Sequence, residues 1–229
     1  MTADRLDNYL AHLAPAYKTA VLDRLEQYRT LLIDANTRVN LTRITEPDDF
    51  FLKHIADSLA VQRVLPELLK TRPLRIVDLG TGGGAPGIPL AIAFPAHRYL
   101  LVDSRKKKID ALSPMIESLG ISAHCEPVWS RGSELHAVRP EWMSAADIVL
   151  ARAVGEPSEV AVECERFRAK ELRVVVYSTP ASAETMKRPD PKRWKMSIGD
   201  SFEITNGTET LSRCFIVLQR SSVRFSLML

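Results

Sequence analysis

The sequence predicts an α/β fold of the Rossmann-like type, in which ligands bind at the carboxyl ends of parallel strands. Three neighbouring features predict it. An apolar run at 74–79 has the length of a buried strand, five of the ten glycines fall within the eight residues 80–87, and an apolar helix at 88–94 follows. Glycine allows positive φ and close approach of a ligand, and a helix start offers free N–H groups. Together these features form the ligand end of such a sheet.

The glycine loop fits two classes of ligand. Gly82-x-Gly84-x-x-Gly87 matches the dinucleotide fingerprint, and Asp103 follows at about the 20-residue spacing of a ribose contact. A carboxylate, Asp78, also lies at the end of the preceding strand, two residues before the first glycine of the loop, Gly80. A carboxylate repels a pyrophosphate and attracts the ammonium and sulfonium groups of S-adenosylmethionine. We therefore favour a methyl donor over a dinucleotide, with both ligands open from the loop alone.

Composition limits the class of protein. A hydrophobic content of 45% and a charged content of 26% over 229 residues are typical of a soluble globular chain. The three cysteines form no CxxC or Cys/His cluster, so neither disulfides nor a metal site is expected. No apolar run approaches the roughly 18 residues of a membrane span. We expect a cytoplasmic monomer that contacts no membrane, and the net charge of +3 permits a polyanionic partner.

Residues 1–70 predict a helical extension before the α/β domain, which we place at 71–229. Apolar residues at helical spacing predict helices at 4–13 and 16–35, and a third helix begins near 46. In this third helix His54, Asp57 and Ser58 lie three and four residues apart and share one face. From the spacing alone, a surface ion pair and a functional face are both open.

The sequence of the α/β domain, residues 71–229, predicts seven strands, of which the last is antiparallel. Alternating helices separate the first five, and a turn at Asn206-Gly207 joins the last two as a hairpin. An arginine, Arg152, ends the fourth strand. The predicted strands are residues 74–79, 98–103, 121–128, 147–152, 172–178, 202–205 and 213–219.

Several motifs resemble the RsmG or GidB family of ribosomal RNA guanine-N7 methyltransferases. The resemblance covers about residues 20–220, and its motifs occur in the family's order. The motifs are Asn40-Leu-Thr42, Lys53-His-Ile-Ala-Asp-Ser58, Asp78-Leu-Gly-Thr-Gly-Gly-Gly-Ala-Pro-Gly-Ile-Pro89, Leu101-Val-Asp-Ser104, Ser130-Arg131 and Leu150-Ala-Arg-Ala153.

This resemblance implies a class I S-adenosylmethionine-dependent methyltransferase that modifies N7 of a guanosine in 16S ribosomal RNA. The partner it implies is ribosomal RNA or the small ribosomal subunit. Arg152, His54, Asp57 and Ser58 would position the substrate, with no general base required, because guanine N7 carries an in-plane lone pair. The implied cofactor-binding residues are Asp78, Gly80, Gly82, Gly84, Ala85, Asp103, Gly132, Ser133 and Arg152.

Two other functions stay open from the sequence. Tyr177-Ser178-Thr179 stands where the family has Leu-Lys-Gly, which leaves room for an RNA-associated module that binds the cofactor with altered or lost catalysis. An NAD(P)-dependent oxidoreductase is less consistent, because Tyr177 has no lysine at helical spacing. Two clusters of basic residues, 105–108 and 187–195, are consistent either with contacts to RNA phosphates or with a solvent-exposed face that binds nothing.

Overall fold

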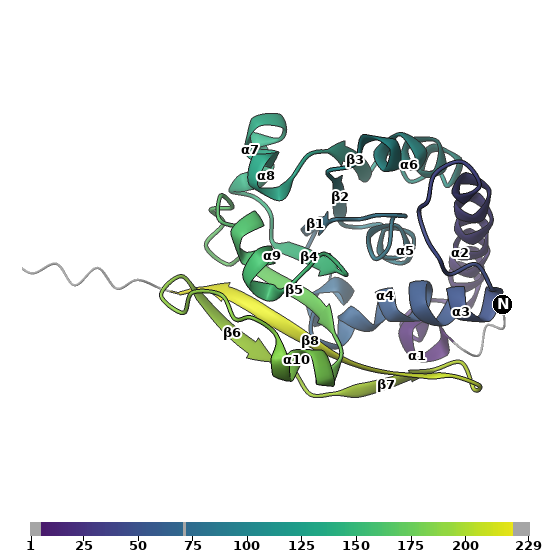
Figure 1. Cartoon of the computed structure of the whole chain (residues 1–229). Coiled ribbons are helices and arrows are strands. Elements are labelled where there is room, and N and C mark those ends of the chain that lie inside the picture. The colour runs from purple at the N-terminus through teal and green to yellow at the C-terminus, as the bar shows by residue number, and fades with distance from the viewer. Residues whose placement is uncertain (1–5, 71, 222–229) are drawn as a thin grey trace, which may run out of the picture.

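The computed structural model of the chain describes residues 6–70 and 72–221. It contains one central sheet of eight strands (Figure 1). The strands are β1 (Arg75–Leu79), β2 (Arg98–Asp103), β3 (Cys125–Trp129), β4 (Ile148–Arg152), β5 (Arg173–Ser178), β6 (Trp194–Ile198), β7 (Phe202–Thr205) and β8 (Thr210–Arg220). Their order is β3-β2-β1-β4-β5-β8-β6, and β7 pairs with β8 beyond this path.

Strands β1 to β5 are parallel, and β8 runs antiparallel beside β5. This order confirms the predicted α/β sheet and its antiparallel last strand. The predicted count of seven strands is one too low, because residues 194–198 form β6 against β8. The helices between the strands are α5 (Gly87–Ala93), α6 (Lys106–Ser118), the 3-10 turn η5 (Gly132–Glu134), α7 (Leu135–Val138), α8 (Pro140–Met143), α9 (Pro157–Glu163) and α10 (Pro180–Thr185).

Alternating side chains of the strands divide the core into two layers. Leu101 and Leu150 belong to the cluster that packs against α5, α6 and the extension, whereas Leu100 and Val149 belong to the cluster beneath α9. Both faces of a parallel sheet are normally covered by helices, so its strands are apolar almost throughout. The polar side chains of the sheet consequently collect at the strand ends, where the site lies.

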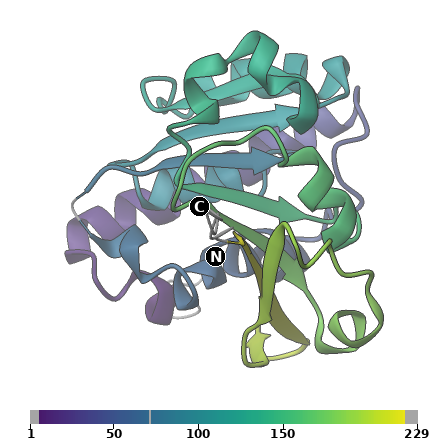
Figure 2. The same ribbon diagram turned by 90° about the vertical axis from the view of Figure 1, so that its left-hand side faces the viewer.

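The helical extension shares its core with the sheet. Tyr28 and Leu32 of the longest helix, α2, lie in the same apolar cluster as β1 and α5, and Figure 2 shows the purple and blue helices along one side of the sheet. The Tyr28 hydroxyl donates to Gly83 O at 2.9 Å. The extension therefore braces the glycine loop, and the boundary between residues 70 and 71 stays a prediction. Its elements are α1 (Asp7–Leu10), α2 (Pro15–Asn36), α3 (Pro47–Phe50), the π-helix η2 (Phe51–Ala56), α4 (Asp57–Leu59) and the 3-10 helices η3 (Ala60–Arg63) and η4 (Pro66–Leu69).

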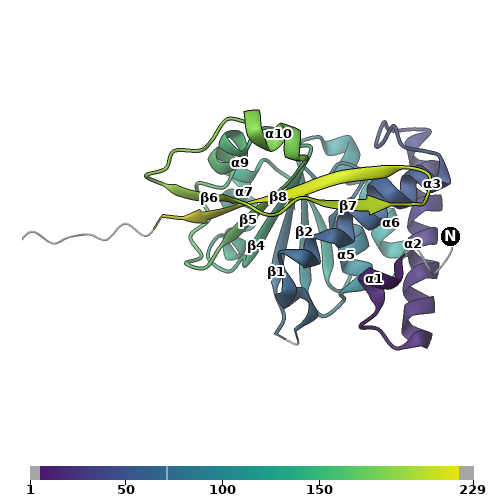
Figure 3. The ribbon, with the colours of Figure 1, turned by 90° about the horizontal axis from the view of Figure 1, so that it is seen from below.

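The long strand β8 joins the sheet to the extension. Figure 3 shows it running from beside β6 to the β7 hairpin near α3. At the hairpin, Lys53 of η2 forms ion pairs with Glu209, at 2.8 Å, and with Asp49, at 3.0 Å. The ion pair with Glu209 therefore connects the π-helix to the β7–β8 hairpin, which helps to fix the side chains that the π-helix presents to the strand ends.

Candidate active site

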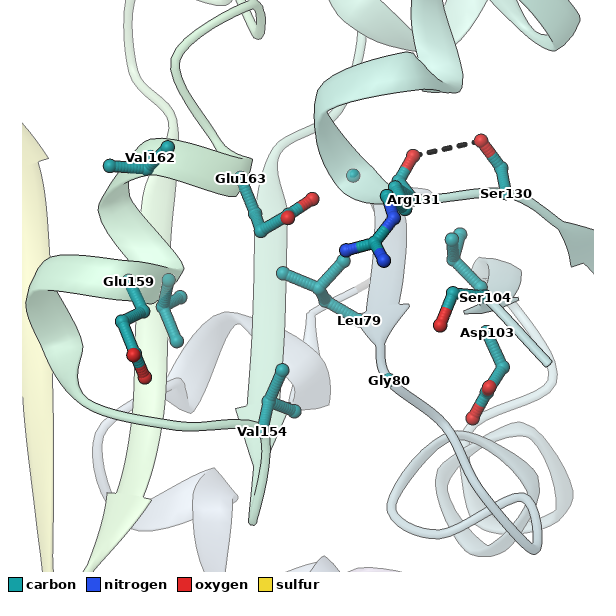
Figure 4. A pocket seen from close by; sticks show the side chains of 13 residues that line it. Leu79, Gly80, Asp103, Ser104, Ser130, Arg131, Val154, Glu159, Val162 and Glu163 are labelled. Carbon is teal, nitrogen blue, oxygen red and sulfur yellow. Dashed lines mark hydrogen bonds between the residues drawn. The ribbon is translucent and has the colours of Figure 1, made fainter.

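A cavity of about 470 Å³ opens at the carboxyl ends of β1 and β2 (Figure 4). We call it the Asp103 cavity. Apolar side chains of Leu79, Val102 and Val154 form part of its wall. The other lining residues are Gly80, Asp103, Ser104, Ser130, Arg131, Gly132, Glu159, Val160, Val162 and Glu163.

The glycine loop begins at the floor of this cavity. Gly80 has φ of 70°, Gly82 of 60° and Gly84 of 100°, all in the left-handed region that favours glycine. A methyl group at Gly84 would also overlap the Ile88 side chain. Of the predicted loop residues, Gly80 lines the cavity, whereas Gly82 and Gly84 shape the turn beyond it. Ala85 is buried and is not among the lining residues.

Asp103 is held rigidly at the cavity rim. Its Oδ2 accepts from Gly82 N at 3.0 Å, and its Oδ1 accepts from Arg105 N at 2.8 Å. A carboxylate can accept about four hydrogen bonds, so both oxygens retain acceptor capacity toward the cavity. A fixed carboxylate of this kind suits the two adjacent hydroxyls of a ribose.

Asp78 braces the loop from inside. Its Oδ2 accepts from the Thr81 hydroxyl at 2.7 Å and from Gly87 N at 2.9 Å. Burial raises the pKa of Asp78 to about 6, against the opposing effect of these two donors. Its Oδ1 has no hydrogen-bond partner among the described residues. Asp78 is not among the cavity-lining residues, so direct contact with a cofactor stays a prediction.

The opposite wall places Gly132 and Ser133 differently. Gly132 lines the cavity, and a methyl group there would lie 2.9 Å from both Glu163 O and Leu79 Cδ1. Ser133 faces Glu163 instead, because its N–H and hydroxyl donate to Glu163 Oε2 at 2.9 and 3.2 Å. Glu163 itself lines the cavity (Figure 4). Glu163 could not be predicted from the sequence, because only the packing of α9 against Gly132 brings it there.

The predicted His54, Asp57 and Ser58 face meets the sheet at Arg152. The Arg152 guanidinium donates to Lys53 O at 2.7 Å, to Asp57 Oδ2 at 3.2 Å and to His54 Nδ1 at 2.9 Å. An arginine only donates, so Nδ1 of His54 carries the lone pair and Nε2 carries the proton. Nε2 therefore donates to Thr42 Oγ1, and these two atoms are 2.8 Å apart. These hydrogen bonds connect the π-helix η2 to the end of β4, and they require the neutral His54 tautomer that carries its proton on Nε2.

Asp57 lies between two arginines. Its side chain is 3% exposed, its Oδ2 pairs with Arg152, and its Oδ1 accepts from Arg213 Nε at 2.8 Å. The open surface-pair interpretation of this face is thus wrong for Asp57, because the pair is buried and reaches across the fold. Ser58 is fully buried; its hydroxyl donates to His54 O, and its own carbonyl accepts from Tyr177 at 3.1 Å.

A second cavity, of about 500 Å³, lies beside this arginine pair. We call it the Arg213 cavity. Arg213 comes from β8 and could not be predicted from the sequence, because only the antiparallel pairing of β8 with β5 carries it to Asp57. The cavity is lined by Asp57, Arg152, Ala153, Gly155, Glu156, Val176, Tyr177, Ser178, Thr179, Ser182, Thr185, Met186 and Arg213.

The turn after β4 separates the two cavities. Val154 faces the Asp103 cavity, whereas Arg152, Ala153 and Gly155 face the Arg213 cavity. Ala153 adopts φ of 56°, a left-handed conformation that is uncommon for a residue with a side chain. Such backbone conformations concentrate at functional sites. A group bound in one cavity is thus one short turn away from a group bound in the other.

The buried histidine makes stability depend on pH in acid. Burial and the nearby Arg152 lower the pKa of His54 from 6.5 to about 3. Between these values the unfolded chain binds more protons than the folded one, so this contribution is complete above pH 6.5 and is lost as pH falls. The raised pKa of Asp78 acts in the opposite sense between pH 3.8 and about 6. The wild-type curve therefore contains both effects.

We expect His54→Gln to remove only the histidine contribution. Between pH 6.5 and 4, unfolding free energy should fall more steeply in the wild type than in the variant, by up to about 1.4 kcal/mol per pH unit. Urea unfolding at a series of pH values measures both slopes. His136→Gln, at a hydrogen-bonded but exposed histidine, is the matched control. Equal slopes for wild type and His54→Gln would show that His54 ionises normally in the folded chain.

Two findings concern other kinds of site. Over residues 6–70 and 72–221, no helix is long and apolar enough to cross a membrane. Within the same described residues, no group of three or more His, Cys, Asp or Glu side chains is placed to hold a metal ion.

Comparisons with known proteins agree with this geometry. The family model described as rRNA small subunit methyltransferase G, GidB, matches residues 21–209. The ribosomal RNA small subunit methyltransferase G of Microcystis aeruginosa is 41% identical over 136 residues, which span 58% of this chain and only 59% of that protein. The protein of the same name from Synechococcus sp. (strain JA-2-3B'a(2-13)) is 34% identical over 187 residues, spanning 80% of this chain and 71% of that protein.

Solved structures show the same fold. A mutant of MtNAS in complex with S-adenosylmethionine superposes with a TM-score of 0.57 at 14% identity, covering 83% of this chain and 72% of that one. At this identity the likeness concerns the fold alone. The parallel sheet with its antiparallel strand is therefore shared with a protein that was solved with this ligand.

Proposed function

We infer the function from one premise, which is that this chain belongs to the GidB family, rRNA small subunit methyltransferase G. We propose that it transfers the methyl group of S-adenosylmethionine to N7 of a guanosine in 16S ribosomal RNA. The observation that carries the proposal is the turn at 152–155, which has one cavity on each side. A methyl donor and an acceptor base can thus occupy adjacent sites.

The Asp103 cavity fits the nucleoside part of S-adenosylmethionine. The fixed Asp103 carboxylate offers acceptors for the ribose hydroxyls, and Leu79, Val102 and Val154 offer an apolar wall for the adenine. When bound, S-adenosylmethionine supplies an electrophilic methyl group on a sulfonium. Gly80 and its loop place the backbone, rather than side chains, beside this ligand.

The Arg213 cavity fits an acceptor base. Guanine N7 carries an in-plane lone pair, so no side chain has to remove a proton before transfer. The residues here need only to orient the base and exclude water, and proximity and orientation supply up to about 7–11 kcal/mol of a barrier. Arg152 and Arg213 are held by Asp57 and His54, which makes their donors rigid. Since the deep groove of A-form RNA is closed to side chains, the guanosine must be unpaired or flipped out.

Nucleoside analysis tests this proposal. The full chain is incubated with S-adenosylmethionine and small-subunit ribosomal RNA, free or in assembled subunits, and the digested RNA is examined by mass spectrometry. We expect 7-methylguanosine as the single new nucleoside. A methyl group on any other position, or none while the cofactor binds, would contradict the assignment.

One observation favours a second candidate. Ser178 lines the Arg213 cavity at the position where the family resemblance implies a lysine, so a base bound in this cavity meets one cation fewer. A cofactor-binding module without turnover would bind S-adenosylmethionine in calorimetry and still yield no methylated RNA. Tighter binding of NAD than of S-adenosylmethionine would instead favour the oxidoreductase.

We also propose that the chain acts as a cytoplasmic monomer. Light scattering measures the mass in solution and so tests whether the chain is monomeric.

Loss of the Asp103 carboxylate should weaken cofactor binding. Asp103→Ala removes charge-assisted hydrogen bonds to the ribose, and each such loss costs about 1.5–3 kcal/mol. Calorimetric titration with S-adenosylmethionine measures the change. Asp110→Ala, at an exposed acid of α6 that pairs with Lys106, is the control and should bind normally. An unchanged affinity in Asp103→Ala would remove this residue from the cofactor site.

A further inference from the structure

Trp129 is an exposed tryptophan beside the Asp103 cavity. It ends β3, the edge strand next to α6 (Figure 1). The residue is 57% exposed, whereas the other two tryptophans, Trp142 and Trp194, are 7% and 3% exposed. Its indole N–H donates to Ser104 O at 3.0 Å. The ring is therefore held in place with its polar group satisfied, while much of its apolar surface faces solvent.

Trp129 lies next to the Asp103 cavity but does not line it. Trp129 lies opposite Asp103 in the β2–β3 ladder, and its partner Ser104 lines the Asp103 cavity. Burying an aromatic side chain is strongly favourable, so a large exposed ring leaves that free energy available to a partner. The ring thus marks the outer rim of the site, on the β3 side.

Two arginines lie close to Trp129 along the backbone, one after its hydrogen-bond partner Ser104 and one after β3. Arg105 precedes α6 and is exposed, and Arg131 lies two residues after Trp129 and lines the cavity (Figure 4). Neither arginine forms an ion pair within the described part of the chain, and the same holds for Lys107. An exposed aromatic ring with unpaired arginines nearby is complementary to a single-stranded nucleic acid, which has negative phosphates and exposed aromatic bases.

We propose that Trp129, Arg105 and Arg131 form a docking surface for an unpaired nucleotide of the RNA substrate. An unpaired base stacks on the indole, and the two guanidinium groups contact the phosphates beside it. The inference rests on the proposed function, since it takes RNA as the substrate, and it adds a contact apart from the base that reacts. Trp194, in the basic cluster at 187–195, cannot serve in this way because it is buried beneath Arg220.

Tryptophan fluorescence tests the contact directly. The full chain is titrated with single-stranded oligoadenylate and, separately, with inorganic polyphosphate, which carries the charge without bases. We expect oligoadenylate to quench the emission of the exposed tryptophan and polyphosphate to leave it nearly unchanged. In Trp129→Phe the quenching should vanish, since the remaining tryptophans are buried. Equal quenching by both polyanions, or quenching that persists in Trp129→Phe, overturns the proposal.

Affinity for small-subunit ribosomal RNA supplies the second measurement. Trp129→Ala should bind about tenfold more weakly, and Trp129→Phe, which retains a ring, should stay within about threefold of wild type. Ile198→Ala changes a residue that is 42% exposed on β6, the opposite edge of the sheet, and should bind normally. The affinity of Trp129→Ala for S-adenosylmethionine should be unchanged, so a loss there would assign Trp129 a structural role instead.

The two proposals fail in distinguishable ways. If the wild type forms 7-methylguanosine and Trp129→Ala binds the RNA equally well, the docking surface is wrong and the proposed function stands. If the wild type neither binds nor methylates ribosomal RNA, both are wrong.

Discussion

Replacing Asp57 by alanine should lower the free energy of unfolding by about 3–5 kcal/mol, because it leaves two partly buried cations without their shared partner. The Asp57 side chain is 3% exposed and pairs with Arg152 and Arg213, whose side chains are 16% and 20% exposed. Removing the acid places two positive charges next to each other without an anion between them. Chemical denaturation followed by circular dichroism measures the loss.

Two variants make this prediction specific. Asp57→Asn retains shape and one acceptor but removes the charge, so it should still be clearly destabilised. Asp110→Ala breaks an exposed pair with Lys106 on α6 and should cost at most about 0.5 kcal/mol. Similar values for Asp57→Ala and Asp110→Ala would mean that the buried pair stabilises the fold no more than a surface pair does.

The parallel part of the fold could be predicted from sequence because its strands are apolar runs bounded by turn residues. Strand β7 was placed at its observed bounds, and its pairing with β8 confirms the predicted hairpin. Strand β6 was not predicted, because it lies partly within the basic cluster at 187–195, where the sequence has no apolar run. Its Trp194 is nevertheless buried, and the ring packs 4.2 Å from the Arg220 guanidinium. Pairing with β8 therefore overrides the local charge pattern.

The third helix of the extension shows a second limit. Spacing predicted one continuous α-helix, whereas the chain passes through α3, the π-helix η2, α4 and the 3-10 helix η3. A π-helical turn shifts the register of side chains and often occurs at functional sites. In η2 it directs both Lys53 O and His54 toward Arg152. Helical spacing grouped His54 with Asp57, and only the tertiary fold shows which arginines they meet.

The candidate site likewise contains some residues that could be predicted from the sequence and others that could not. Asp103 and the glycine loop could be found because both follow strands directly, and adjacent parallel strands place their carboxyl ends together. Glu163 and Arg213 could not be found, since each reaches its partner through contacts across the fold, 30 residues away at Ser133 and 156 residues away at Asp57. No periodicity or short motif in the sequence indicates a contact between residues that lie so far apart in the chain.

Arg152→Ala should reduce kcat for ribosomal RNA methylation by about 100-fold or more, since a small misplacement of the reacting groups has effects of this size. Arg152 lines the Arg213 cavity and also connects β4 to three groups of the extension. Affinity for S-adenosylmethionine should change little, because Arg152 is not among the residues lining the Asp103 cavity. Single-turnover methylation and calorimetry measure the two effects separately.

Arg152→Lys tests whether geometry rather than charge matters. A lysine is a point charge and cannot reproduce the planar fork that reaches Lys53 O, Asp57 and His54 together, so it should restore little of the rate. Arg139→Ala, at an arginine paired with Glu126 away from both cavities, controls for the loss of one positive charge. A rate that falls only in proportion to the unfolded fraction would give Arg152 a purely structural role. Full activity in Arg152→Lys would show that a positive charge alone is sufficient at the end of β4.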